Sequence, residues 1–285
     1  MMEMPDEIME YLQKKDAREI NLVEFNERKG RYCYSFRLND RKYFLKWNDK
    51  DPAHEKFRLL LQNEIRVYSL LKEEAITPAS LSDVPEDMLV MEFLPDAVTL
   101  RKCLKECGQD PESVKKVIED VFSAWYRGVR ILGKAPEEEE AESDYSLFDR
   151  YLYSLLCSGP FEMKQRKAEW YRNRAIRKVM SKKAAKCLKQ REEGEPSGIH
   201  GDFHANNVLI SKGRCCLIDL ENAGIGCPDI EMAYLYAQLK LLLRDQTEII
   251  RWMNHYLESM ISDRQLFRYC AKVYYRAIRL NHRFY

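Results

Sequence analysis

The sequence has no long hydrophobic run and almost no excess of charge of either sign. Its 47 Lys and Arg residues are balanced by 46 Asp and Glu residues, which gives a formal net charge of +1. This balance excludes a protein that binds nucleic acid through an overall basic surface, so no nucleic-acid partner is expected. No apolar run approaches the roughly 20 residues of a membrane-spanning helix. Residues 1–7 lack the charged and then apolar pattern of a signal peptide, so we expect a cytoplasmic protein with no transmembrane segment.

A disulfide framework is not indicated either. The nine cysteines are odd in number and scattered along the chain, which is typical of reduced thiols. The 285 residues, 45% of them hydrophobic, suffice for one large or two ordinary domains.

The residues that carry chemistry are concentrated in residues 199–219. An apolar stretch leads into a His-Gly-Asp sequence that ends at Asp202, Asn207 follows five residues later, and Asp219 ends a second apolar stretch after another twelve. Asp202 can accept the proton of an attacking hydroxyl, and Asn207 and Asp219 offer the oxygen ligands that suit Mg²⁺ on nucleotide phosphates. Taken singly, such residues are more often turn residues. A zinc site that used the two histidines beside Asp202 would lack a fourth ligand.

With this spacing, the His-Gly-Asp sequence, Asn207 and Ile218-Asp219 resemble the catalytic and metal-binding motifs of the aminoglycoside phosphotransferase/choline kinase superfamily. Protein kinases carry His-Arg-Asp and Asp-Phe-Gly where this chain has His-Gly-Asp and Asp219-Leu220-Glu221. The resemblance implies an α+β, two-lobed, protein-kinase-like fold with a small β-rich N-terminal lobe and a larger, mainly helical C-terminal lobe. It also implies Mg²⁺ as the cofactor and ATP as the co-substrate.

The N-terminal part contains the elements that such a site requires. Residues 31–38 and 41–47 are β-prone and flank an Asn-Asp turn signal, which predicts a β-hairpin with Lys46 near its end. Residues 57–71 have a helical period that places Glu64 on the apolar face, where a carboxylate needs a partner. The resemblance implies that Lys46 is this partner and neutralises the α and β phosphates of ATP. An isolated strand lysine is otherwise most often a surface residue.

An apolar strand over residues 87–95 stops at a proline, which cannot continue a strand ladder. In the superfamily this strand leads into the hinge. The resemblance implies that Met91 lines the back of the adenine pocket and that the backbones of Glu92 and Leu94 bind the base. We therefore place the domain boundary here, with a nucleotide-binding lobe at 1–95 and a helical lobe with the catalytic loop and acceptor site at 96–285.

A glycine-rich phosphate loop is missing. Between the strand predicted at residues 20–25 and Arg31, the chain has only Asn26 to Gly30, with a single glycine. Gly30 permits a tight turn whose amides approach a phosphate. Members of the superfamily often lack the full glycine signature.

A segment that follows Asp219 resembles the superfamily element Gly-x-Pro-x-x-Asp. Here Pro228 suits the first turn of a helix, and Glu231 stands where Asp is usual, so any hydrogen bond from this side chain to the catalytic loop must be re-aimed. Further helices are predicted at 99–106, 111–131, 232–243, 246–260 and 264–283.

Two charge runs remain. The acidic run at 137–144 is either a solvated loop or a surface that attracts a cationic acceptor. Residues 164–191 contain twelve Lys or Arg residues; they form either a solvated helix face or a contact for an anionic lipid, a glycan or RNA.

Together these patterns predict an ATP-dependent phosphotransferase that acts on a hydroxyl of a small molecule, such as an aminoglycoside-like compound, a sugar or an amino alcohol. One alternative is a kinase of a lipid-linked or cell-envelope saccharide, which the basic run motivates. Another is a pseudokinase that binds a partner without turnover.

Overall fold

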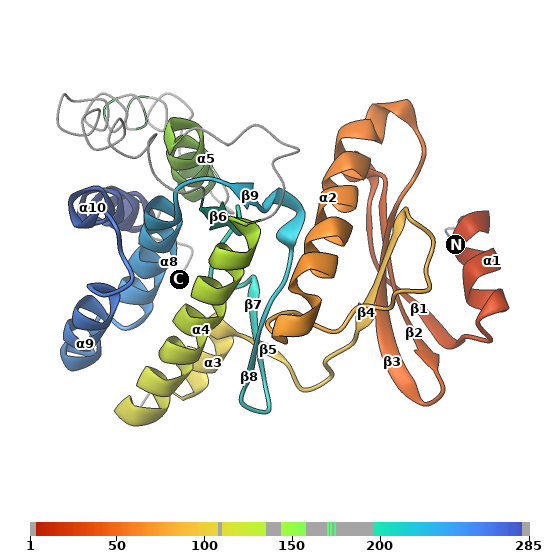
Figure 1. The fold of residues 1–285 in the computed structure, drawn as a ribbon, viewed down its shortest axis with the longest axis horizontal. Coiled ribbons are helices and arrows are strands. Elements are labelled where there is room, and N and C mark those ends of the chain that lie inside the picture. The colour runs from red at the N-terminus through yellow and green to blue at the C-terminus, as the bar shows by residue number, and fades with distance from the viewer. Residues whose placement is uncertain are drawn as a thin grey trace.

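The computed structural model describes residues 4–107, 110–134, 144–157, 170, 172, 174 and 197–280. A four-stranded antiparallel sheet with two helices forms the N-terminal part, and a mainly helical part follows it (Figure 1). This arrangement agrees with the expected α+β fold class. No helix in these described stretches is long and apolar enough to cross a membrane.

The N-terminal sheet runs in the order β1-β2-β3-β4. Its strands are β1 (Arg18–Asn26), β2 (Arg31–Leu38), β3 (Arg41–Asn48) and β4 (Met88–Glu92). The predicted hairpin between β2 and β3 is confirmed, and its turn residues Asn39 and Asp40 have φ values of 46° and 65°. Asn and Asp tolerate this left-handed backbone, which two-residue hairpins require.

The alternation of side chains along the sheet determines where Lys46 points. Leu45 and Trp47 of β3 pack in the core that includes helix α1 (Asp6–Lys14). Phe44, one position earlier, packs in the core that includes helix α2 (Glu55–Leu71). Because successive strand residues face opposite sides, Lys46 shares the α2 face with Phe44. The buried residues of α2 recur at helical spacing and include Glu64, so the carboxylate faces the sheet as predicted.

The C-terminal part surrounds two small sheets with helices. The strands β5 (Val98–Thr99), β7 (Val208–Ser211) and β8 (Arg214–Leu217) form one sheet, and β6 (Gly198–Ile199) pairs with β9 (Gly224–Ile225). The described helices are α3 (Leu100–Glu106), α4 (Pro111–Leu132), α5 (Asp144–Cys157), α8 (Pro228–Leu242), α9 (Thr247–Leu257) and α10 (Arg264–Leu280).

The bounds of several predicted elements change, and the three largest changes are as follows. The strand predicted over 87–95 ends at Glu92, three residues before the proline. The helix predicted from 232 begins at Pro228, so Glu231 lies in its first turn. The helix predicted over 246–260 spans only 247–257.

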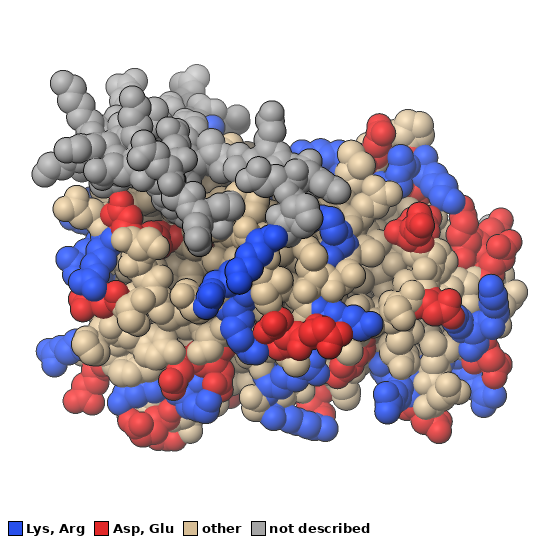
Figure 2. All heavy atoms as spheres, viewed as in Figure 1, with Lys and Arg blue, Asp and Glu red and all other residues tan. Residues whose placement is uncertain are grey.

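The described surface carries both signs of charge, and Figure 2 shows Lys and Arg interspersed with Asp and Glu over one face. The acidic run at 137–144 lies outside the described side chains, and so does the basic run at 164–191 apart from residues 170, 172 and 174.

Candidate active site

A cavity of about 480 Å³ lies between the N-terminal sheet and residues 202–221, which include the end of the His-Gly-Asp sequence and the strands β7 and β8. Seven of the eight predicted site residues line it: Lys46, Met91, Glu92, Leu94, Asp202, Asn207 and Asp219. The eighth, Glu64, is fully buried behind Lys46. The fold therefore brings together residues that are up to 173 positions apart in sequence.

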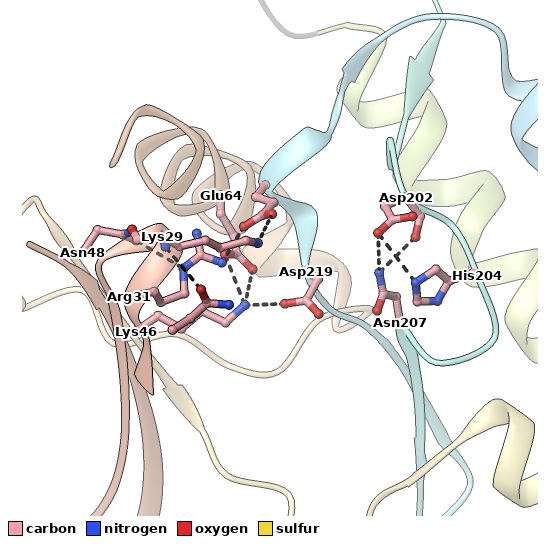
Figure 3. A network of polar contacts seen from close by, with 11 residues as sticks. Lys29, Arg31, Lys46, Asn48, Glu64, Asp202, His204, Asn207 and Asp219 are labelled. Carbon is pink, nitrogen blue, oxygen red and sulfur yellow. Dashed lines mark hydrogen bonds and ion pairs between the residues drawn. The ribbon is translucent and has the colours of Figure 1, made fainter. Parts of the chain in front are cut away.

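Lys46 is held by two carboxylates (Figure 3). Its ammonium lies 3.0 Å from Oε1 of Glu64 and 2.5 Å from Oδ1 of Asp219. Burial alone would lower the pKa of Lys46, but the two carboxylates outweigh it and raise this pKa above its usual value. Burial raises the pKa of Glu64, and the charge of Lys46 opposes that shift. The ion pair expected between Lys46 and Glu64 is thus present, and its lysine is charged.

Asp219 lies where β8 gives way to the short turn η4 (Leu220–Asn222). Its backbone is left-handed, with φ 57° and ψ 53°. Burial opposes ionisation of this carboxyl, but Lys46 prevails and lowers its pKa, so Asp219 is an anion at neutral pH. The amide of Ile218 donates to the carbonyl of Asn207 at 3.0 Å, which fixes Asp219 beside Asn207.

Asp202 and Asn207 form a second group (Figure 3). The Asn207 side chain donates through Nδ2 to the carbonyl oxygen of Asp202 at 3.0 Å and to its Oδ2 at 3.3 Å. His204 Nε2 lies 3.6 Å from the same Oδ2. Because Nδ2 is used in this way, Oδ1 of Asn207 is left as an acceptor. The Asp202 side chain is 38% exposed, so a small molecule can reach it.

The two oxygen donors fit a hard cation. Oδ1 of Asn207 and the Asp219 oxygen that does not contact Lys46 are ligands of the kind Mg²⁺ prefers. A zinc site is not supported by the described residues, which contain no group of three or more His, Cys, Asp and Glu side chains placed to hold a metal.

Glu231 holds the backbone of the loop that contains His200, Gly201 and Asp202. This buried carboxylate accepts hydrogen bonds from the backbone amides of His200 at 3.0 Å and Gly201 at 2.7 Å. It also accepts from the indole of Trp125 at 2.8 Å and the hydroxyl of Tyr151 at 2.7 Å. The longer side chain that replaces the usual Asp still reaches the loop, so the re-aimed hydrogen bond is formed.

His200 is also buried. Its Nδ1 accepts from the amide of Asp202 at 3.3 Å, which leaves the proton of the neutral ring on Nε2. Burial lowers the pKa of His200. The ring is therefore a neutral support for the loop.

The hinge differs in one detail from the expectation. The amide of Glu92 donates to Ala79 at 2.8 Å, so only its carbonyl is available to a base. The Glu92 carboxylate also faces away, toward Ala79 and Arg214. The Leu94 amide has no partner among the described residues, and Met91 accepts from Tyr68 at the back of the cavity.

Sequence reasoning missed a charged group at the opposite end of the cavity. Lys29 and Arg31 line it, and both pair with Glu221, which lies two residues after Asp219. The opposite charges are visible in the sequence, but about 190 residues separate the partners, so no local pattern indicates the contact.

Comparisons with known proteins agree with this geometry. The sequence model of the phosphotransferase enzyme family matches residues 31–251. The structure of aminoglycoside phosphotransferase APH(4)-Ia is similar, with a TM-score of 0.54 and 17% identity over 97% of this chain and 93% of that one. Choline kinase LicA from Streptococcus pneumoniae gives a TM-score of 0.52 and 18% identity over 95% of each chain.

Aminoglycoside phosphotransferase APH(3'')-Id from Streptomyces rimosus gives a TM-score of 0.56 and 14% identity over 96% of this chain and 99% of that one. A comparison with curated protein sequences gives no significant match. The family match and the structural likeness confirm the predicted superfamily and fold class.

Proposed function

The chain belongs to the phosphotransferase enzyme family, and from this premise we propose that it transfers the γ-phosphoryl group of Mg·ATP to a hydroxyl of a small molecule. One observation carries the proposal. A single cavity is lined by a buried, charged lysine, by two oxygen ligands for a cation and by an accessible aspartate, which are Lys46, Asn207, Asp219 and Asp202.

The hinge end of the cavity suits adenine. The carbonyl of Glu92 can accept from the amino group of the base, and the amide of Leu94 can donate to the adjacent ring nitrogen. Met91 closes the back of this end. The solved structures support a nucleotide here, because APH(4)-Ia occurs in a ternary complex with AMP-PNP and hygromycin B, and APH(3'')-Id occurs with ADP and streptomycin.

At the other end, Lys46 is oriented by Glu64 and neutralises phosphate charge. Asn207 and Asp219 would hold Mg²⁺, whose chemistry is to neutralise the charge of the phosphates. Asp202 accepts a hydrogen bond from the acceptor hydroxyl and places its oxygen in line with the γ phosphorus. Because phosphoryl transfer depends chiefly on positioning and charge, loss of Asp219 lowers kcat by several powers of ten.

The acceptor class is part of the proposal. A hydroxyl of a sugar, an aminoglycoside-like compound or an amino alcohol fits the accessible Asp202. A cytoplasmic location, where ATP is abundant, belongs to the same proposal. The alternative of a lipid-linked or cell-envelope saccharide depends on the run at 164–191, of which the structure describes only residues 170, 172 and 174.

Mass spectrometry of acceptors incubated with the protein and Mg·ATP tests this function. The acceptor panel contains aminoglycosides, choline, ethanolamine, simple sugars and a glycolipid extract. We expect one product that is heavier by a phosphoryl group, lost in Asp202→Asn and retained in Asp96→Asn. Asp96 is a suitable control because it is exposed and pairs with Lys212. A protein that binds ATP but phosphorylates no acceptor, including those of a native extract, is the pseudokinase, and this outcome would overturn the proposal.

A further inference from the structure

The turn at the phosphate end of the cavity differs from a glycine-rich loop in how its backbone amides are used. Strands β1 and β2 are joined by the short 3-10 turn η1 (Glu27–Lys29). The amide of Lys29 donates to the side chain of Asn26 at 3.2 Å, and the amide of Gly30 donates to the carbonyl of Glu27 at 3.1 Å. Two amides that would face a phosphate in a glycine-rich loop are thus engaged within the turn.

Side chains take the place of these amides in lining the cavity. Gly30 has φ 56° and turns the chain between Lys29 and Arg31, and a Cβ at this position would lie 2.3 Å from the ring of His54. Lys29 and Arg31 both line the cavity. Figure 3 shows them extending, together with Lys46, from the sheet toward Glu64 and Asp219.

One carboxylate of the other part of the chain engages both cations. Glu221 Oε2 accepts from Nη1 of Arg31 at 2.6 Å, and Glu221 Oε1 lies 3.3 Å from Nζ of Lys29. The Arg31 side chain is only 9% exposed. Its Nε donates to Asn48 at 3.2 Å, but its buried Nη2 has no hydrogen-bond partner in the described part of the chain. A buried guanidinium with an unused donor is costly unless a further acceptor arrives.

Each cation at this end is paired with a carboxylate in the absence of a nucleotide. Three cations, Lys29, Arg31 and Lys46, meet three carboxylates, Glu64, Asp219 and Glu221. A phosphate group would compete with these carboxylates for the cations. Glu221 is the carboxylate whose partners are the two cations of the β1–β2 connection, and it comes from the other part of the molecule.

We propose that Arg31 and Lys29 bind the terminal phosphates of the nucleotide in place of a glycine-rich loop, and that Glu221 occupies them until a phosphate displaces it. The inference rests on the proposed function. A guanidinium suits this task because its planar donors bind phosphate oxygens in pairs. Glu221 keeps the guanidinium in position before binding, and the exchange releases the two ion pairs that Glu221 makes with Arg31 and Lys29.

Isothermal titration calorimetry with ADP and with adenosine, both in EDTA, separates phosphate contacts from base and metal contacts. We expect Arg31→Ala to weaken ADP binding about tenfold or more, since a charge-assisted hydrogen bond contributes that much, and to leave adenosine binding unchanged. Lys29→Ala has a smaller effect in the same direction. Arg37→Ala is the matched control, because Arg37 lies on the same strand and pairs with the exposed Glu19.

Two variants of Glu221 test the exchange. Glu221→Gln removes the competing charge, so ADP binds more tightly in EDTA. In the double variant Arg31→Glu with Glu221→Arg, the ion pair is reversed. We expect this variant to recover the melting temperature lost in Arg31→Glu but not the affinity for ADP.

The contrary outcomes are distinct. If Arg31→Ala weakens adenosine and ADP equally, or if the reversed pair restores ADP binding, Arg31 is only structural and the inference is overturned. If wild type binds ADP and Arg31→Ala binds it as tightly, the inference alone fails. If wild type binds neither ADP nor adenosine, the proposed function fails and this inference with it.

Discussion

The carboxylate of Glu231 accepts a hydrogen bond of 2.7 Å from the backbone amide of Gly201, thirty residues earlier in the chain. Glu231 lies in the first turn of α8, and Gly201 is the middle residue of the His-Gly-Asp sequence. The same carboxylate holds the amide of His200 and the side chains of Trp125 and Tyr151. A single buried side chain therefore connects α4, α5 and α8 to the loop that carries Asp202.

Glu231→Gln is expected to destabilise the protein by about 3 kcal/mol, because an amide nitrogen would then face buried donors that lose their acceptor. Glu231→Asp, the residue usual in the superfamily, shortens the side chain and gives a smaller loss. Urea unfolding measures both changes. Glu248→Gln is the control, since Glu248 is exposed in the first turn of α9. Equal stabilities of Glu231→Gln and Glu248→Gln would show that the buried hydrogen bonds contribute little.

Gly201→Ala is expected to reduce both the melting temperature and kcat. Gly201 has φ 84°, and a Cβ there would lie 1.8 Å from the carbonyl oxygen of Asn222. Gly213 provides a matched control, because its φ is 78° but nothing lies within 4 Å of an added Cβ. Gly213→Ala therefore has only the backbone cost of about 1 kcal/mol. Thermal unfolding of the two variants side by side measures the difference, and an equal effect would contradict the close approach at Gly201.

The elements with local signals could be predicted from the sequence. The β2–β3 hairpin follows from β-prone residues around an Asn-Asp turn, and the burial of Glu64 follows from its spacing in α2. The start of α8 at Pro228 differs from the start predicted at residue 232, although a proline suits the first turn of a helix.

The contacts that could not be predicted depend on tertiary packing. The pairing of Arg31 with Glu221 joins residues 190 positions apart. The amide of Glu92 is taken by Ala79, which follows α2 by several residues and has no sequence signal of its own. Such contacts are set by how the two parts of the chain pack together, and periodicity within one element does not contain that information.

Lys46→Met is expected to destabilise the protein by about 3–5 kcal/mol, because it leaves Glu64 buried without a cation. Adding Glu64→Gln removes the unpaired charge and restores part of the stability. ATP binding stays weaker than in wild type in both variants, since neither has Lys46 to contact the phosphates. Chemical unfolding and calorimetry measure the two properties separately. Recovery of ATP binding in the double variant would show that Lys46 has no role beyond its ion pair.

The stability of the protein is expected to fall as the pH drops from about 7.5 through the usual histidine pKa near 6.5. Burial lowers the pKa of His200 in the folded state, so below that pH the unfolded chain binds a proton that the folded chain does not, and unfolding is favoured. Four charged or titratable groups also act on the pKa of His200: the carboxylates of Glu231, Asp202 and Asp219 raise it, and His204 lowers it.

His200→Gln is expected to flatten this dependence, because the glutamine does not titrate. Melting temperatures at several pH values between 5.5 and 8 measure the slope for both proteins. Parallel slopes would mean that another group causes the loss of stability.

Calorimetric titration of the wild-type protein with ATP, in EDTA and in Mg²⁺, tests the central claim most directly, because it requires no knowledge of the acceptor. We predict that wild type binds ATP and that Mg²⁺ tightens the binding. The effect of Mg²⁺ is lost in Asp219→Asn and kept in the exposed control Asp96→Asn. Failure of wild type to bind ATP in either condition, or an equal effect of Mg²⁺ on wild type and Asp219→Asn, would contradict the account.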